Sequence, residues 1–179
     1  MENGAAEAAA GLAAVDPRPT GRRAALILAA VALIVAVDQA TKAWAVASLS
    51  DGPIGLIGEG VELRLSRNPG GAFSTFRGAT PVLAVIAAGA SVFLWRTAHR
   101  ATDRWVLTGL VLVLSGALGN LVDRVARSPG FLRGHVVDFV SVGWWPVFNV
   151  ADSAITLGAI ALVIRTWRAQ PDPAPDSGG

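Results

Sequence analysis

The sequence predicts an α-helical membrane protein with four transmembrane helices. Of its 179 residues, 53% are hydrophobic and 16% are charged, and the mean hydropathy is +0.51. This composition is too apolar for an ordinary soluble domain and is typical of a protein with several membrane spans. A soluble helical bundle would also need polar helix faces, which three of the apolar segments almost lack. The four segments are residues 24–49, 80–95, 105–122 and 146–164.

The four segments predict that both termini lie on one side of the membrane, in the cytoplasm. A bilayer core about 30 Å thick is crossed by about 20 helical residues, so each segment is long enough or nearly so. Eight of the 15 lysines and arginines lie on the terminal side, and basic residues gather at cytoplasmic span ends. They are Arg18, Arg22, Arg23, Arg96, Arg100, Arg104, Arg165 and Arg168. Four acids then lie toward the outer face: Asp38, Asp123, Asp138 and Asp152.

The regions outside the spans carry different signals. Residues 1–20 and 169–179 are rich in small residues, proline and acids, and we predict that both are disordered cytoplasmic tails. The tryptophans lie near span ends, where tryptophan usually anchors a protein at the membrane interface. Trp144 and Trp145 directly precede the fourth segment.

The polar region 50–78 separates the first two segments. Residues 61–66 alternate between apolar and polar types, which predicts a strand. A turn sequence, Asn-Pro-Gly-Gly, occupies 68–71, and Ala72-Phe73 could return an aromatic ring toward lipid. Spacing alone leaves two interpretations open: a surface hairpin that links two helices, or a small extracytoplasmic sheet that covers a site or lies on the membrane.

The first segment contains the only lysine of the chain. Asp38 and Lys42 are four residues apart with the acid first, the order that favours an ion pair on one helix face. We interpret them as a pair that satisfies itself. A lone lysine can also be the general base for a serine nucleophile, but no serine lies in a recognisable nucleophile motif.

Two acids lie in or beside apolar sequence without a basic neighbour. Asp138 lies between Val136-Val137 and Phe139-Val140, and Asp152 opens the last apolar segment. A carboxylate at the centre of a bilayer costs about 2.5–3.5 kcal/mol on insertion scales, so such acids are candidates for function. Two of them in one short window suggest a pair that shares a proton, as in aspartic proteases.

The other two acids each have a cation nearby in the sequence. Asp38 has Lys42, and Asp123 has Arg124. A nearby cation favours the ionised carboxylate. Asp138 and Asp152 have no lysine or arginine within four residues and are therefore the better candidates to share a proton.

An Asn-x-x-Asp spacing occurs twice, at Asn120/Asp123 and at Asn149/Asp152. An asparagine beside an aspartate can donate a hydrogen bond that fixes the carboxylate without adding charge. Either copy alone would be explained by polar contacts between helices, worth about 0.6–2 kcal/mol each. Two copies together with Asp138 favour a functional site.

Five stretches of the chain, in order, resemble the lipoprotein signal peptidases, also called signal peptidase II. The similarity covers about residues 24–167 and departs at Ser115, where many members have glycine. The link from Asp138 to Asp152 is also shorter than in many members, which leaves a helix there undecided. The stretches are residues 37–42, 67–74, 116–124, 134–139 and 148–155.

The resemblance implies a fold and an activity. The implied fold is a four-helix transmembrane peptidase domain, residues 21–168, with an extracytoplasmic β-cradle at about 50–78. The implied enzyme is an aspartic endopeptidase of the bacterial plasma membrane with its active site near the outer leaflet. Its substrates are prolipoproteins whose lipobox cysteine carries diacylglycerol, and cleavage is just before that cysteine. The family is inhibited by globomycin.

The resemblance also assigns residues. The catalytic pair falls on Asp138 and Asp152, the pair reached above. Eight further positions match motif residues that shape the site or contact substrate: Asp38, Lys42, Asn68, Gly70, Asn120, Asp123, Arg124 and Asn149. One aspartate would activate a water while the other polarises the scissile carbonyl.

We expect no metal, no cofactor and no nucleic acid, and we expect a monomer in contact with membrane lipid. The chain has no cysteine and two histidines, which excludes thiol chemistry and leaves little for a histidine metal site. Two other functions remain open from the residues alone. One is a small ion- or proton-coupled transporter that uses the buried acid–base pairs, and the other is a non-catalytic lipid-binding or assembly subunit.

Overall fold

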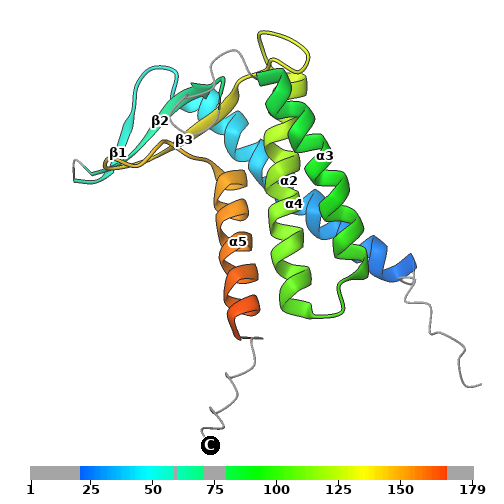
Figure 1. The fold of residues 1–179 in the computed structure, drawn as a ribbon. Coiled ribbons are helices and arrows are strands. Elements are labelled where there is room, and N and C mark those ends of the chain that lie inside the picture. The colour runs from blue at the N-terminus through cyan, green and yellow to red at the C-terminus, as the bar shows by residue number, and fades with distance from the viewer. Residues whose placement is uncertain (1–20, 59, 71–79, 169–179) are drawn as a thin grey trace, which may run out of the picture.

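A computed structural model describes residues 21–58, 60–70 and 80–168 (Figure 1). The predicted tails, 1–20 and 169–179, and the Ala72-Phe73 segment lie outside the described residues. The elements in chain order are α2 (Gly21–Ser48), β1 (Ile54–Ile57), β2 (Val61–Asn68), α3 (Thr80–Arg100), α4 (Arg104–Ala126), β3 (Val136–Val142) and α5 (Val150–Arg168).

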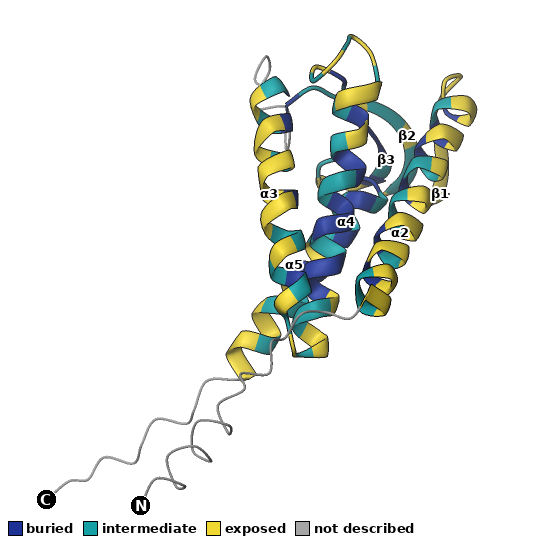
Figure 2. Cartoon of the chain, turned by 90° about the vertical axis from the view of Figure 1, so that its right-hand side faces the viewer, coloured by how far each residue is buried: buried dark blue, intermediate teal, exposed yellow. Residues whose placement is uncertain are grey.

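The four helices confirm the predicted membrane fold. Each of α2, α3, α4 and α5 is long and apolar enough to cross a bilayer. Large apolar side chains on them are exposed, such as Leu33 at 66% and Val163 at 65%. Much of the outward surface of the helices is coloured as exposed in Figure 2. In water such faces would be costly to expose, whereas lipid is an apolar solvent for them. The bundle is therefore apolar outside as well as inside.

Helix α4 is the central helix and packs through small residues. It is the most buried of the four and contacts α2, α3 and α5 (Figure 2). A Cβ at Gly116 would collide with the carbonyl oxygen of Ala151 and come within 2.6 Å of Ile155 Cγ1. A Cβ at Gly158 would lie 2.7 Å from the carbonyl oxygen of Gly109. The backbones of α4 and α5 thus approach too closely for side chains at these positions.

The polar region forms a small sheet, as in the second interpretation, and not a hairpin alone. Strand β2 covers the predicted 61–66 and lies between β1 and β3 in an antiparallel sheet. The sheet lies at one end of the bundle and extends to its side (Figure 1). Ser66 of β2 stands opposite Asp138 of β3, and Asn68 stands opposite Val136. This register brings the Asn68 turn to the predicted acid.

Strand β3 and the start of α5 were not foreseen. Residues 136–139 of β3 are buried on both faces, so they form an apolar run with no alternation to mark a strand. The fourth helix begins at Val150 and not at Pro146, because Phe148 still pairs with Val140 of β3. The link between Asp138 and Asp152 is thus a strand and a turn, and it contains no helix before Val150.

The helix ends away from the sheet are tied together by arginines. Arg23 of α2 donates to the carbonyl oxygen of Ala101, and Arg165 Nε lies 2.6 Å from Asp103 Oδ2. Helix α2 begins and helix α5 ends at this end (Figure 1). The sheet with Asp138 and these arginine-rich helix ends therefore lie at opposite ends of the bundle.

We predict that Gly116→Ala destabilises the protein by about 1–3 kcal/mol, because the new methyl group would force α4 and α5 apart. Thermal unfolding in detergent, followed by tryptophan fluorescence, measures the effect. The matched control is Gly89→Ala in α3, where the added Cβ meets nothing within 4 Å and should raise stability slightly. Equal unfolding temperatures for the two variants would contradict the packing described.

Candidate active site

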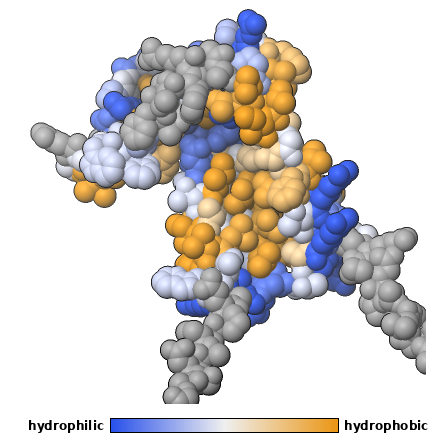
Figure 3. Space-filling view, viewed as in Figure 1, coloured by the Kyte–Doolittle hydropathy of each residue, from blue (hydrophilic) through white to orange (hydrophobic). Residues whose placement is uncertain are grey.

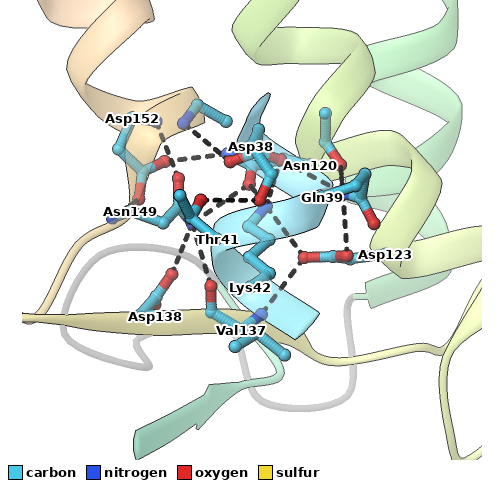
Figure 4. Close-up of polar contacts among 12 residues, drawn as sticks. Asp38, Gln39, Thr41, Lys42, Asn120, Asp123, Val137, Asp138, Asn149 and Asp152 are labelled. Atoms are coloured by element: carbon cyan, nitrogen blue, oxygen red, sulfur yellow. Dashed lines mark hydrogen bonds and ion pairs between the residues drawn. The ribbon is translucent and has the colours of Figure 1, made fainter. Parts of the chain in front are cut away.

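The ten residues singled out in the sequence meet where the sheet joins the bundle. Hydrogen bonds and ion pairs link all of them in one connected network. Figure 4 shows the part of it around Lys42, Asn120 and Asn149. Helices α2, α4 and α5 and strands β2 and β3 each contribute. Residues 114 positions apart in the chain, Asp38 and Asp152, thus belong to the same cluster.

The ammonium group of Lys42 is at the centre of the network. It is fully buried and lies 2.8 Å from Asp38 Oδ2, 2.9 Å from Asp123 Oδ2 and 2.9 Å from Asn120 Oδ1. The expected ion pair between Asp38 and Lys42 forms, but Lys42 also binds a second acid, Asp123. All three protons of the ammonium group therefore have an acceptor, as a buried charge requires.

The cation partners of Asp123 differ from the expectation. Its carboxylate binds Lys42 and also Arg127, whose Nε is 2.6 Å from Oδ1. The sequence neighbour Arg124 does not supply this contact, because adjacent helical residues point in different directions. Arg124 donates to the carbonyl oxygen of Asn120 at 3.1 Å instead. Among the described residues, its buried Nε has no hydrogen-bond partner.

Asp38 fixes the start of α5 from the neighbouring helix. Its Oδ1 accepts a hydrogen bond from the backbone N–H of Ala151 at 2.9 Å. The first N–H groups of a helix have no partner within the helix, and a carboxylate there is favourable. Gly119 leaves the room for this contact, since a Cβ there would lie 2.7 Å from Asp38 Oδ2. Asp38 therefore helps to position Asp152, one residue beyond Ala151.

The two asparagines act across the cluster more than within their own motifs. The Asn-x-x-Asp repeat had suggested that Asn120 bonds Asp123. Instead, Asn120 Nδ2 donates to Asp152 Oδ1 at 2.8 Å. Asn149 Nδ2 donates to Asp138 Oδ1 at 2.7 Å. Asn149 also caps α5 reciprocally with Asp152, since each backbone N–H bonds the other side chain, at 2.9 and 3.3 Å. Asn149 thus contacts both acids of the predicted pair.

Asp138 and Asp152 line the same cavity, of about 410 Å³. Polar side chains of Asn68, Asn120 and Arg124 share the lining with apolar ones, among them Trp145, Phe148 and Ile155. Asn68 Nδ2 donates to Asp138 Oδ2 at 3.1 Å, and Gly70 N–H holds Asn68 by donating to its Oδ1 at 3.0 Å. Among the described residues, no group of three or more histidine and acidic side chains is placed to hold a metal ion.

Burial and the charge of Asp152 raise the pKa of Asp138 from 3.8 to about 7. Hydrogen bonds from Asn68 and Asn149 and the charge of Lys42 act in the opposite direction without reversing the shift. Asp138 therefore exchanges a proton near neutral pH, as a catalytic acid or base must.

A comparison with known families shows what the chain is related to. The family described as Signal peptidase (SPase) II matches residues 30–168. The chain belongs to this family. As a signal peptidase II, it is a protease of the membrane, and the transporter hypothesis has no support.

Individual relatives show the same similarity. A protein of Rhodococcus jostii named lipoprotein signal peptidase is 52% identical over 84% of this chain and 77% of its own length. One of Mycobacterium avium with the same name is 50% identical over 86% and 85%. A bacterial membrane enzyme solved by the in meso method at 1.9 Å resolution has a TM-score of 0.69 at 25% identity, covering 82% of this chain and 95% of that one.

The sequence analysis missed two residues of this polar cluster, Gln39 and Arg127. Gln39 Nε2 lies within hydrogen-bond distance of Asp38, Asp123 and the carbonyl oxygen of Gly119. Arg127 binds Asp123 and reaches Gln39 Oε1 at 3.4 Å. The i,i+4 spacing of Asp123 and Arg127 was a signal that could have identified the pair.

We predict that Lys42→Met destabilises the protein by about 3–5 kcal/mol, because Asp38 and Asp123 would face each other without the cation between them. The free energy of unfolding in mixed micelles measures the loss. Arg64→Gln is the control, since its exposed ion pair with Glu62 should contribute less than about 1 kcal/mol. A Lys42→Met protein as stable as the control would show that the network is not a structural centre.

The raised pKa of Asp138 predicts a stability that falls as the pH rises from about 4 to about 7. In this window the folded chain keeps a proton that the unfolded chain has lost, so raising the pH favours unfolding. Asp138→Asn removes this difference in proton binding. The change in Tm between about pH 5 and pH 7.5 should therefore be smaller in Asp138→Asn than in the wild type, whereas Asp51→Asn, at an exposed site, should leave it unchanged. If Asp138→Asn follows the wild-type profile, Asp138 does not carry the shift.

Proposed function

We propose that this signal peptidase II is an aspartic endopeptidase that uses Asp138 and Asp152 to remove the signal peptide from a prolipoprotein. The observation that carries the proposal is that the two carboxyl groups line one cavity and both contact Asn149. A pair of acids in such a setting can hold one proton between them, so that one is an acid while the other is a base.

The surroundings distinguish the two acids. Asp138 has a pKa near neutrality and is assigned as the protonated partner. Asp152 lies in the first turn of α5, where the helix dipole favours a negative charge, and accepts hydrogen bonds from Asn120 and Asn149. Asp152 is therefore assigned as the ionised partner and general base.

The reaction follows from these assignments. Asp152 takes a proton from a water whose oxygen attacks the scissile carbonyl carbon, while Asp138 gives its proton to the carbonyl oxygen. The tetrahedral diol then collapses as the C–N bond breaks. Asp152 gives its proton to the leaving nitrogen, and Asp138 takes one from the diol. Both acids return to their starting states.

Other features of the site fit a lipidated peptide. Arg124 lines the cavity, and its guanidinium could donate to a substrate carbonyl or a lipid oxygen there. A second hollow of about 440 Å³ shares Trp145, Phe148 and Asp152 with the first and continues along α5 to Leu157. Its mainly apolar lining would accept the acyl chains of a diacylglyceryl-cysteine, while the peptide lies at the acids.

The charge distribution supports an outward-facing site. The described arginines at the span ends away from the sheet favour the cytoplasm under the positive-inside rule. They are Arg22, Arg23, Arg96, Arg100, Arg104, Arg165 and Arg168. The sheet and both acids would then face the extracytoplasmic side, with both termini in the cytoplasm.

The test is cleavage of a diacylglyceryl prolipoprotein by Asp138→Asn and Asp152→Asn in detergent or nanodiscs. Each variant should lose cleavage by a factor on the order of 10²–10⁴, because an amide can neither take nor give the required proton. The double variant should be hardly slower than either single variant, since the two acids act as a unit.

Asp51→Asn is the matched control, because it makes the same chemical change at an exposed position and should cleave at the wild-type rate. Retained cleavage in either active-site variant, with the protein shown to be folded by its Tm, would remove the aspartic mechanism. If an asparagine variant also unfolds, the Asp138→Glu and Asp152→Glu proteins decide the question. They keep a carboxyl group and should recover part of the rate.

A further inference from the structure

A groove on α5 runs from Leu157, which also lines the hollow beside Asp152, to the end of the helix away from the sheet. It has a volume of about 460 Å³, and its apolar part is formed by Leu157, Ile160, Ala161 and Ile164. These residues recur at helical spacing and form a stripe roughly 10 Å long, since a helix rises about 1.5 Å per residue. Leu157, Ile160 and Ile164 are 59%, 48% and 45% exposed in the chain. The stripe thus faces the surroundings of the bundle, which for a spanning helix are lipid.

The other end of the groove is basic and aromatic. Arg165, Arg168 and Trp105 line it. The guanidinium of Arg165 is oriented by Asp103, at 2.6 Å, and Asp103 is itself held by the backbone N–H groups of Trp105 and Val106. The apolar surface of the bundle gives way to a hydrophilic surface at this end of the helices (Figure 3).

Trp105 separates the groove from a second basic hollow. Arg104, Trp105 and Thr108 line that hollow, and the Arg104 guanidinium lies 5.7 Å from the centre of the Trp105 ring. Three arginines thus surround one tryptophan, with Asp103 as the acid among them. This end of the groove therefore carries a net positive charge beside the apolar stripe.

We propose that this groove binds one anionic phospholipid. An acyl chain lies on the stripe from Leu157 to Ile164, and the phosphate is bound by Arg168 together with Arg165. Trp105 lies at the depth of the glycerol esters, where tryptophan is enriched in membrane proteins. Basic pockets at the ends of transmembrane helices bind acidic headgroups by the same charge complementarity.

Charge argues against two other occupants. The helix of a signal peptide would bring its positively charged N-terminal region against Arg165 and Arg168. A second copy of the chain that used the same face would bring like arginines together. The negative charge of a phospholipid phosphate, by contrast, is attracted to these arginines.

The experiment is native mass spectrometry of the full chain released from nanodiscs that contain equal amounts of phosphatidylglycerol and phosphatidylcholine. The wild type should retain phosphatidylglycerol in preference to phosphatidylcholine. Arg168→Gln should reduce this preference about fivefold, the value of one arginine near a membrane surface. Ile160→Trp, which fills the stripe and keeps every charge, should reduce the retention of both lipids.

The matched control is Arg96→Gln, which removes an exposed arginine from the same end of α3, a helix that packs on α4. It should keep the wild-type preference, since Arg96 is absent from the groove. Equal retention of the two lipids by the wild type would overturn the proposal. An effect of Arg168→Gln no larger than that of Arg96→Gln would also overturn it. The same holds if an uncleavable signal peptide displaces the lipid, or if the chain forms a dimer that Ile160→Trp dissociates. None of these measurements depends on cleavage.

Discussion

The buried ammonium group of Lys42 is the contact on which the architecture of the site depends. A charge in the middle of a helical bundle is costly unless it is fully paired and hydrogen-bonded. Here the compensation comes from Asp38, Asp123 and Asn120, and each of these side chains also holds another part of the site. Asp38 bonds the first turn of α5, Asp123 bonds the backbone N–H of Val137 in β3, and Asn120 bonds Asp152. Neutralising one lysine thus fixes both elements that carry the proposed catalytic acids.

Amide groups separate this charged centre from the acids themselves. Asn120 lies between Lys42 and Asp152, and Asn149 lies between Asn120 and Asp138. Asn120 accepts from Lys42 through Oδ1 and donates to Asp152 through Nδ2, while Asn149 donates through Nδ2 to both Asn120 and Asp138, so these amides fix the orientation of the acids. They do not bring a full positive charge to the carboxylate, so burial and the repulsion of Asp152 still raise the pKa of Asp138 to about 7. The site thereby combines rigid placement with a proton that can be exchanged near neutrality.

The two ends of the bundle are specialised in opposite ways. At the sheet end, close helix packing at Gly116 and Gly119 brings acids and amides from three helices within contact. At the other end, arginines tie the helix ends together and line a groove toward lipid. The apolar surface between the two ends suits a membrane span.

The sequence by itself predicted the four spans and the strand at 61–66, and motif spacing together with the family resemblance pointed to the ten site positions, while the pairing of Asp138 with Asp152 for catalysis stays a prediction. Those features follow from local composition, period and motif spacing, which are properties of short stretches. It did not determine strand β3, whose two buried faces remove the alternation that marks a strand, or the start of α5 at Val150. Only the tertiary structure decided that Asp123 binds Lys42 and Arg127 and not Arg124, that Asn120 serves Asp152, and that Gln39 joins the cluster. These partners come from different helices or from different faces of one helix, so their contacts depend on how the helices are rotated and packed, which no local pattern encodes.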